Sequence, residues 1–396
     1  MISYKLPDSV KIVLNRLETN GFEAFVVGGY VRDLLLGRET HDCDVTTNAR
    51  PHEIEKVFME YKQSHIGKDH GTVGVKIDGE WIEITTYRVD EATLDHRRPK
   101  AVRFSAHLKE DVLRRDFTMN ALAMDISGAL IDFVGGQNDI QEAVIRCVGD
   151  PHLRFDEDAL RILRALRFAA QLDFKIDARS VNAMRKHAHL LNNLAVERVF
   201  QELQLIFAAK RSSLALFYGQ DILSHIIIEM DQLSAFEINM LDEFEDVRIK
   251  WVICFRSNTV EEMQGRLVKL KAPKQFVQDC AQLHTCYHHR FSKDEYALKL
   301  MMHQYPNTIL QMAMDMQMKL QDPMYDVEAH RILNNLIETN ACVQLKDLDL
   351  DGHDLMEYQI KGKQIQVLLD KALDAVMRDL VVNSKTELLA WLNLTS

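Results

Sequence analysis

The distribution of glycine most constrains what this chain can fold into. Of its 16 glycines, 12 lie at or before Gly149 and only four lie after it. Glycine supplies the turns and bulges that a sheet needs, and it destabilises the interior of a helix. The first part of the chain is therefore expected to contain a sheet, and the remainder is expected to be helical.

Hydrophobic periodicity predicts the same division. Apolar and β-branched runs predict strands before Gly149, and apolar residues at three- and four-residue spacing predict helices after Pro151. The fold class is thus α+β, a small mixed head followed by an extended all-helical neck, body and tail. The predicted strands are 22–29, 43–47, 71–77, 80–87 and 129–134, with helices at 30–37 and 50–61, and the clearest later helices are 158–172, 196–209 and 362–377.

Length, composition and charge exclude several classes of protein. A chain of 396 residues exceeds what one hydrophobic core usually organises, so several domains are expected. No run of about 18 apolar residues occurs, which excludes a membrane span, and no signal-peptide pattern begins the chain. The six cysteines form no CxxC pair, so reduced thiols and a cytoplasmic location are predicted. The net charge of −11 argues against indiscriminate nucleic-acid binding, although residues 146–198 carry ten basic and seven acidic side chains.

The clearest chemical signature is a pair of glycines followed, after twelve residues, by Asp-x-Asp. Gly28 and Gly29 end an apolar strand, and backbone N–H groups at glycines can approach a phosphate closely. Asp42 and Asp44 lie two apart on a predicted strand, so both carboxylates point to one face. Paired carboxylates suit Mg²⁺, which binds triphosphate oxygens and can activate an attacking hydroxyl. Each motif alone is more often a turn or a pair of solvated aspartates.

Two later segments combine arginines with carboxylates. Residues 110–125 contain Arg114 and Arg115 beside an aspartate, and guanidinium groups match phosphate oxygens bidentately. In residues 157–168, Asp158 and Arg161 are three apart on a predicted helix and so share a face. Arg164 and Arg167 continue that row. In isolation, each segment is more often a charged surface.

Taken in order, these motifs resemble the class II tRNA nucleotidyltransferases. These are the CCA-adding enzymes of the polymerase-β-like nucleotidyltransferase superfamily, and bacterial poly(A) polymerases are their close relatives. The match is dense over residues 22–170, and residues 352–388 are similar to the C-terminal pattern of the Gram-positive type. The motifs that carry the resemblance are GG-x-x-RD, DxD, IEITTYR, HRRP, RRDFTMNA and EDALR.

The resemblance implies a domain organisation and a role for each motif. Asp42 and Asp44 would hold Mg²⁺, and Glu83 would complete the catalytic acids and help deprotonate the primer 3′-hydroxyl. Asp158 and Arg161 would read the incoming base. The phosphates would be contacted by Gly29, Arg32, Arg115, Arg164 and Arg167, and residues 91–104 would form the loop that changes specificity from C to A. The implied domains are a nucleotidyltransferase head over 1–145, a base-recognition neck over 146–209, a body over 210–295 and a tRNA-binding tail over 296–396.

Hydrogen-bond chemistry agrees with the implied base recognition. A carboxylate only accepts and a guanidinium only donates, so Asp158 and Arg161 complement the amine and ring nitrogen of cytosine or adenine. Uracil and guanine present groups of the opposite polarity there. Leaving buried polar groups unpaired costs about 1–3 kcal/mol each, which is enough for useful rejection.

The predicted activity is template-independent addition of C, C and A to the 3′ end of tRNA from CTP and ATP, with release of pyrophosphate. The alternatives are a CC-adding, A-adding or poly(A)-polymerase-type terminal transferase, or a non-catalytic RNA-binding protein of the same fold. The predicted partner is the acceptor end of tRNA, with no membrane, and both monomer and homodimer stay open. A histidine- and cysteine-rich segment at 280–289 does not match the spacing of a zinc site, so a partly buried helix is preferred there.

Overall fold

The chain divides into two compact units, Met1–Glu245 and Asp246–Ser396. The computed structural model describes residues 6–40, 43–68, 71–90 and 102–394. The first unit contains the main sheet and the second is built from helices, so the predicted fold class is confirmed. The finer division at 146, 210 and 296 stays a prediction. In the described residues, no helix combines the length and apolar character that crossing a membrane would require.

A seven-stranded mixed sheet forms the centre of the first unit. Its strand order is β3-β4-β5-β2-β1-β8-β9, and all neighbouring pairs are antiparallel except β2 and β5, which run parallel. In β4, half-buried and buried residues alternate, as the predicted period of two requires. The strands are β1 (Ala24–Val27), β2 (Asp44–Thr47), β3 (Lys62–Ser64), β4 (Thr72–Ile77), β5 (Glu80–Thr86), β8 (Leu122–Met124) and β9 (Leu130–Asp132).

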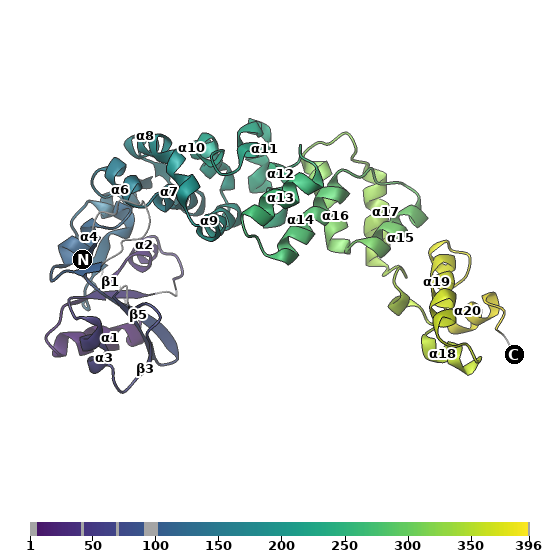
Figure 1. The fold of residues 1–396 in the computed structure, drawn as a ribbon, viewed down its shortest axis with the longest axis horizontal. Helices are drawn as coiled ribbons and strands as arrows, with labels where there is room; N and C mark the ends of the chain where they lie inside the picture. The colour runs from purple at the N-terminus through teal and green to yellow at the C-terminus, as the bar shows by residue number, and fades with distance from the viewer. Residues whose placement is uncertain (1–5, 41–42, 69–70, 91–101, 395–396) are drawn as a thin grey trace. The chain divides into compact units, whose positions relative to one another are not determined.

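Two helices cover one face of this sheet. Figure 1 shows α1 (Asp8–Thr19) and α3 (Pro51–Val57) side by side against the strands. Val13, Leu14 and Leu17 of α1 are completely buried in this layer, because the apolar residues of the helix recur at three- and four-residue spacing. A third helix, α2 (Gly29–Leu35), begins directly after β1 and contacts β1 and β8.

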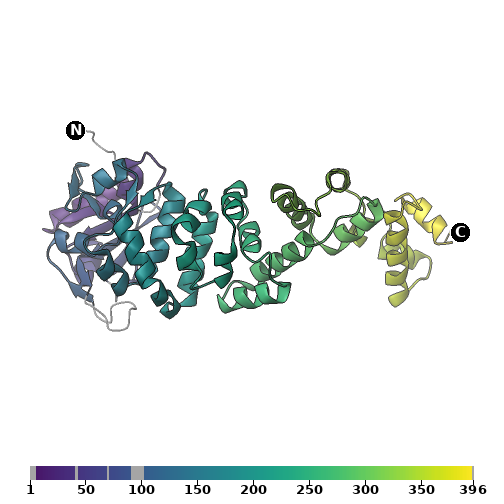
Figure 2. The ribbon, with the colours of Figure 1, turned by 90° about the horizontal axis from the view of Figure 1, so that it is seen from above.

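The rest of the first unit is mainly helical. In α7 (Leu160–Leu172), Leu163 and Leu166 are completely buried, and this helix packs on α9 and α10. Figures 1 and 2 both show the first helices after Pro151, coloured blue to teal, beside the sheet. The other helices here are α4 (Leu108–Leu113), α5 (Gly136–Gln141), α6 (Pro151–Glu157), α8 (Ala178–His187), α9 (Val196–Ala208), α10 (Ser212–Leu223) and α11 (Ala235–Met240).

Helices also make up the second unit. Pro273 and Pro306 directly precede two of them, where the fixed φ of proline is compatible with a helix start. The helix predicted at 362–377 is α19. The helices are α12 (Val247–Cys254), α13 (Val260–Lys269), α14 (Lys274–Tyr287), α15 (Glu295–Gln304), α16 (Asn307–Lys319), α17 (Val327–Glu338), α18 (Gly352–Glu357), α19 (Lys363–Met377) and α20 (Lys385–Trp391).

The sequence prediction missed the short strands. β8 lies inside the segment 110–125, which was interpreted from its charges alone, and its three residues are all buried. Strands of two or three residues are too short for a period of two to be recognised. The other missed strands are β3, β6 (Arg88–Asp90), β7 (Val102–Phe104), β10 (Val144–Ile145) and β11 (Lys175–Ile176).

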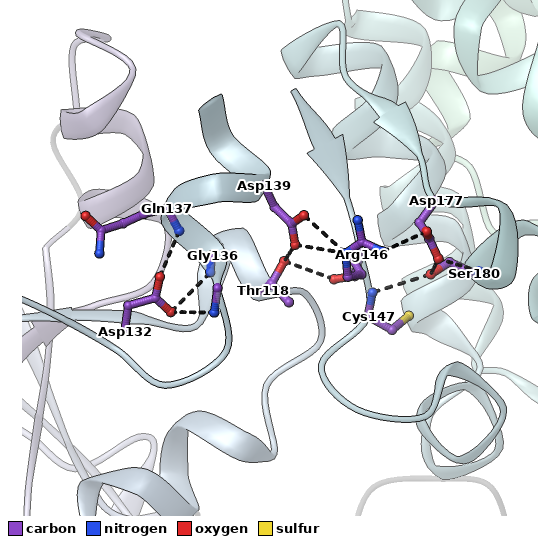
Figure 3. Close-up of polar contacts among 10 residues, drawn as sticks. Thr118, Asp132, Gly136, Gln137, Asp139, Arg146, Cys147, Asp177 and Ser180 are labelled. Carbon is purple, nitrogen blue, oxygen red and sulfur yellow. Dashed lines mark hydrogen bonds and ion pairs between the residues drawn. The ribbon is translucent and has the colours of Figure 1, made fainter. Parts of the chain in front are cut away.

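A polar network joins the sheet to the helices that follow it (Figure 3). Arg146 donates from Nε to Asp139 at 3.1 Å and from Nη1 to Asp177 at 2.8 Å. Thr118 donates from Oγ1 to Asp139 at 2.6 Å. Asp177 also accepts a hydrogen bond from the backbone N–H of Ser180 and so caps the N-terminus of α8. Because Asp139 is buried, its charge needs these donors, and the network therefore links the two parts of the unit.

The turn before α5 leaves no room for a side chain at Gly136. Asp132 accepts backbone N–H groups at Gly136 and Gln137 and holds the turn in place (Figure 3). A Cβ atom at Gly136 would lie 2.2 Å from the carbonyl oxygen of Thr118, and backbone atoms cannot move away easily. We therefore expect Gly136→Ala to destabilise the chain by about 1–3 kcal/mol, measured by urea unfolding. Gly265→Ala is the control, because nothing lies within 4 Å of a Cβ there and alanine favours its helix. Equal effects of the two substitutions would contradict this packing argument.

The second unit contains a histidine whose protonation opposes folding. His284 on α14 is buried, and its ring lies 4.5 Å from that of His288. Burial, and then the neighbouring His288, lower the pKa of His284. The unfolded chain therefore binds more protons than the folded chain as the pH falls below about 6.5, so stability is lost towards acid.

We expect the melting temperature to fall between about pH 7.5 and about pH 5, and to fall less in His284→Gln. His289→Gln removes an exposed histidine from the same segment and serves as the control. An unchanged pH dependence in His284→Gln would show that this ring does not oppose folding in acid.

Candidate active site

Two carboxylates lie side by side where β2 and β5 run parallel. Asp44 and Glu83 are register partners across these strands, and both residues are exposed. The side chain of the preceding Cys43 is buried, so the alternation of the strand turns Asp44 away from the core. Adjacent strands are about 4.8 Å apart, which brings both carboxylates within reach of one cation. Asp42, the other predicted metal ligand, lies outside the described residues, as does most of the predicted loop at 91–104.

The glycine turn lies directly beside this pair. Gly28 has φ +78°, and a Cβ atom there would lie 3.2 Å from Arg115 Nη1 and 3.9 Å from Asp44 Oδ2. An L-residue would be strained in this conformation and would crowd the Arg115 guanidinium, whereas the distance to Asp44 is an ordinary contact. Gly29 is the predicted phosphate contact. A Cβ atom added there would lie 3.5 Å from Arg32 Nη2, which is an ordinary contact distance. The strict requirement for glycine is therefore at Gly28.

The arginines of the RRD segment are anchored by a buried aspartate that the sequence analysis did not single out. Asp111 is completely buried and accepts from Arg114 at 2.8 Å and from Arg115 at 3.3 Å. Burial acts to raise the pKa of Asp111, but the two guanidinium groups overcome this and hold the pKa below its usual value. The buried Nε of Arg115 has no hydrogen-bond partner among the described residues. The guanidinium of Arg115 thus lies between Asp111 and Gly28.

A chain of hydrogen bonds connects Arg32 to Arg164. Arg32 donates from Nη1 to Asn120 Oδ1 at 2.7 Å, and its other nitrogens donate to Asp33. Asn120 donates to Asp116 at 3.4 Å, and Asp116 accepts from Arg164 Nε at 2.7 Å. Burial acts to raise the pKa of Asp116, but Arg164 holds it below the usual value. Asn120 and Asp116 therefore connect two of the predicted phosphate-binding arginines, and the only sequence signal for them was their place in RRDFTMNA.

The next arginine of α7 pairs with an acid from another helix. Arg167 Nε lies 3.1 Å from Glu202 of α9, and both side chains are largely buried. Burial raises the pKa of Glu202. Burial also lowers the pKa of Arg167, although the charge of Glu202 acts in the opposite direction. Nothing in the local sequence indicated this pairing.

The prediction that Asp158 and Arg161 share one helix face is wrong. Asp158 is extended, with φ −149° and ψ 102°, and separates α6 from α7. Its Oδ1 accepts from the backbone N–H of Leu160 at 3.0 Å, and its Oδ2 accepts from Arg198 at 3.2 Å. Aspartate competes for backbone N–H groups in this way, which favours a helix start over a helix interior.

Arg161 lies in the first turn of α7, just beyond this break. It donates from Nη1 to Glu157 at 2.7 Å and from Nη2 to the carbonyl oxygen of Arg114 at 3.1 Å. The second bond joins α7 to the RRD segment. The break and the first turn of α7 are thus tied to Arg198 and to the RRD segment. Glu157 stands in the EDALR motif without a predicted role, and no sequence pattern indicated Arg198.

Three family models match successive parts of the chain. They are described as "Poly A polymerase head domain" over residues 24–146, "Probable RNA and SrmB-binding site of polymerase A" over 173–231, and "tRNA nucleotidyltransferase domain 2" over 243–392.

Similar proteins and structures agree with these matches. The chain is 35% identical over 396 residues to a CCA-adding enzyme of Bacillus pumilus. The aligned residues make up 96% of this chain and 95% of that enzyme. The structure of the Bacillus stearothermophilus CCA-adding enzyme in complex with CTP superposes with a TM-score of 0.80 at 27% identity, covering 97% of this chain and 96% of that one. The Thermotoga maritima CCA-adding enzyme complexed with tRNA shares the fold, with a TM-score of 0.66 at 19% identity. The superposition covers 98% of this chain and 96% of that one.

The resemblance carried by the sequence motifs is thereby confirmed. Because the Bacillus pumilus relative matches nearly end to end at 35% identity, the chain belongs to the CCA-adding enzymes, the class II tRNA nucleotidyltransferases with a poly A polymerase head domain, of the type found in Gram-positive bacteria.

Proposed function

We propose that this chain adds C, C and A in turn to the 3′ end of tRNA from CTP and ATP, and that Asp42, Asp44 and Glu83 are its catalytic acids. The observation that carries the proposal is the register of Asp44 and Glu83 on parallel strands, beside Gly28 and Arg115. The 3′-hydroxyl oxygen of the tRNA attacks the α-phosphorus of the nucleotide, and pyrophosphate leaves. Glu83 accepts the proton of that hydroxyl.

Mg²⁺ fits this set of donors. Asp44 and Glu83 offer exposed carboxylate oxygens on neighbouring strands, and hard oxygen ligands are those that Mg²⁺ prefers. Asp44 and Asp42 would hold the ion, with Glu83 next to it. When bound, Mg²⁺ would lower the pKa of the attacking hydroxyl and neutralise charge on the phosphates. The residues of the chain position the reacting groups around it.

The arginines of the site bind the triphosphate. Arg32, Arg115, Arg164 and Arg167 converge from α2, the RRD segment and α7, and guanidinium groups pair bidentately with phosphate oxygens. Arg115 Nη1 lies close to Gly28, so a phosphate at the glycine turn would be within reach of this guanidinium. Gly29 allows the backbone to approach the phosphates.

Asp158 and Arg161 read the base from the break between α6 and α7. A carboxylate has about four acceptor positions, and the contacts to Leu160 and Arg198 use two of them. The remaining capacity suits the exocyclic amine of cytosine or adenine. Arg161 donates to the ring nitrogen beside that amine.

The partners and the location follow from this activity. The acceptor end of tRNA, CTP and ATP are the substrates, and tRNA repair places the protein in the cytoplasm. The Bacillus stearothermophilus and Thermotoga maritima structures, with CTP and with tRNA, support both kinds of ligand. A monomer and a homodimer are both compatible with a site whose described residues all lie in one unit.

A terminal-transfer assay separates the alternatives. tRNA substrates lacking CCA, ending in C, or ending in CC are each offered CTP, ATP or both. Addition of all three nucleotides, ending after A, is expected. Products that stop at CC identify a CC-adding enzyme, addition only to tRNA ending in CC identifies an A-adding enzyme, and long A tails identify a poly(A) polymerase. Absence of transfer with intact tRNA binding identifies a non-catalytic RNA-binding protein.

Removing either described acid of the metal site should abolish catalysis. We expect Asp44→Asn and Glu83→Gln each to lower the rate of CMP addition at least about a hundredfold while tRNA binding stays intact. The matched control is Glu80→Gln, since Glu80 is also exposed on β5 but bonds to Ser9. Rates close to wild type in Glu83→Gln would rule out its catalytic role, and equal losses in Glu80→Gln would indicate damage to the strand.

Base selection should depend on the Asp158 carboxylate. Asp158→Ala removes the acceptor for the exocyclic amine, so the kcat/KM ratio of CTP to UTP should fall about tenfold to a hundredfold on tRNA lacking CCA. Asp150→Ala is the matched control. Asp150 also caps a helix, since it accepts a hydrogen bond from the backbone N–H of His152 at the start of α6, but it has no proposed role in base recognition. An unchanged CTP/UTP ratio in Asp158→Ala, with both rates reduced together, would make Asp158 a structural cap only.

A further inference from the structure

One aromatic ring lies at the centre of the triphosphate-binding arginines. Phe168 of α7 is 6% exposed. The guanidinium carbons of Arg32, Arg164 and Arg167 lie 5.2, 5.4 and 4.5 Å from the centroid of its ring. Distances below about 6 Å are those at which a cation is attracted to the electron-rich face of an aromatic ring. Phe168 therefore contacts cationic groups from both α2 and α7.

The three guanidinium groups repel one another, and the ring counteracts this. Because each lies within 5.4 Å of the same centroid, no two of their carbons are further apart than about twice that distance. Asp33, Asp116 and Glu202 each pair with one of them. Burial raises the pKa of Glu202, and burial first, then Arg164 and Arg32, lower the pKa of Arg167. The three carboxylates thus balance the guanidinium charges one for one, and the ring adds an attraction that holds the three cations together in a largely buried place.

A second aromatic ring restricts the orientation of Phe168. Phe117, which is completely buried, meets Phe168 edge to face, with centroids 5.8 Å apart and ring planes at 86°. Such a contact favours one setting of the ring. Phe117 also directly follows Asp116, the partner of Arg164, so the same segment positions the ring and one of its cations.

We propose that Phe168 is a positioning residue, whose ring holds the guanidinium groups of Arg32, Arg164 and Arg167 in place for the triphosphate of the incoming nucleotide. The inference rests on the proposed function, which assigns these arginines to the phosphates. An aliphatic side chain of similar volume would fill the same space in the core but would offer the cations no attraction. The ring face, rather than its bulk, is what the site requires.

The test uses inorganic tripolyphosphate as a probe that has the phosphates but no base. Its affinity for the full chain is measured by calorimetry, alongside KM and kcat for CTP on tRNA lacking CCA. Phe168→Leu should weaken tripolyphosphate binding and raise KM for CTP about fivefold to thirtyfold, with a smaller change in kcat. Phe168→Tyr, which keeps the ring, should restore most of the affinity. Cytidine, which lacks phosphates, should bind equally to all variants.

Two further variants separate ring electrostatics from packing. Phe168→trifluorophenylalanine keeps the shape of the ring and weakens its negative face, so it should lower tripolyphosphate affinity even if Phe168→Leu folds poorly. Phe58→Leu removes a completely buried ring of the same unit that contacts neither Phe168 nor a guanidinium among the described residues, and it should leave that affinity within about twofold of wild type.

Each possible outcome is informative. Unchanged tripolyphosphate affinity in Phe168→trifluorophenylalanine would overturn the inference, as would an equal loss in Phe58→Leu. Arg164→Ala tests the proposed function separately. If Arg164→Ala binds tripolyphosphate as tightly as wild type, the assignment of the arginines to the phosphates fails, whatever the Phe168 variants do. If Arg164→Ala weakens binding and the Phe168 variants do not, only the role of Phe168 fails.

Discussion

The parallel pairing of β2 with β5 is the constraint on which the active site depends. Every other neighbouring pair in the main sheet is antiparallel. The chain leaves β2, passes through α3, β3 and β4, and returns in β5 beside it. This return brings Glu83 opposite Asp44. Because side chains alternate between the faces of a strand, a shift of one residue in β5 would turn Glu83 to the other face and separate the two carboxylates.

Charge balance explains how so many arginines can lie around this pair. Guanidinium groups are costly to bury unless a carboxylate or another acceptor accompanies them. Each arginine of the site has such a partner, and the partners come from different segments: Asp33 from α2, Asp111 from α4, Asp116 from the loop after it and Glu202 from α9. The acids hold the guanidinium groups in place before any nucleotide binds. Pre-organisation of this kind reduces the reorganisation that binding requires.

The break between α6 and α7 shows how a local preference can serve a site. A continuous helix would satisfy the backbone of residue 158 internally, but the carboxylate of Asp158 instead accepts the Leu160 N–H and begins a new helix. Arg198 of α9 then orients the same carboxylate. The residue proposed to read the base is therefore held by one local and one long-range contact. The Arg146 network joins the sheet to α8 through Asp139 and Asp177, and the acids and the helical part of the site belong to one unit.

Much of this protein could be predicted from its sequence, because the signals are local. The concentration of glycine before Gly149 and the change of hydrophobic period after Pro151 distinguish the sheet from the helices. The motif order identified the family and led to Asp44, Glu83 and the four arginines proposed to bind the triphosphate. Strands β3 and β8 were missed because three residues show no period, and one helix was drawn through Asp158 because helical spacing does not reveal a side chain that caps the backbone. Only the tertiary structure decided the pairing of Arg167 with Glu202, the place of Arg198 beside Asp158, and the three guanidinium groups around Phe168. These contacts join residues that are distant in the chain, and packing alone determines which of many possible acids, arginines and rings meet.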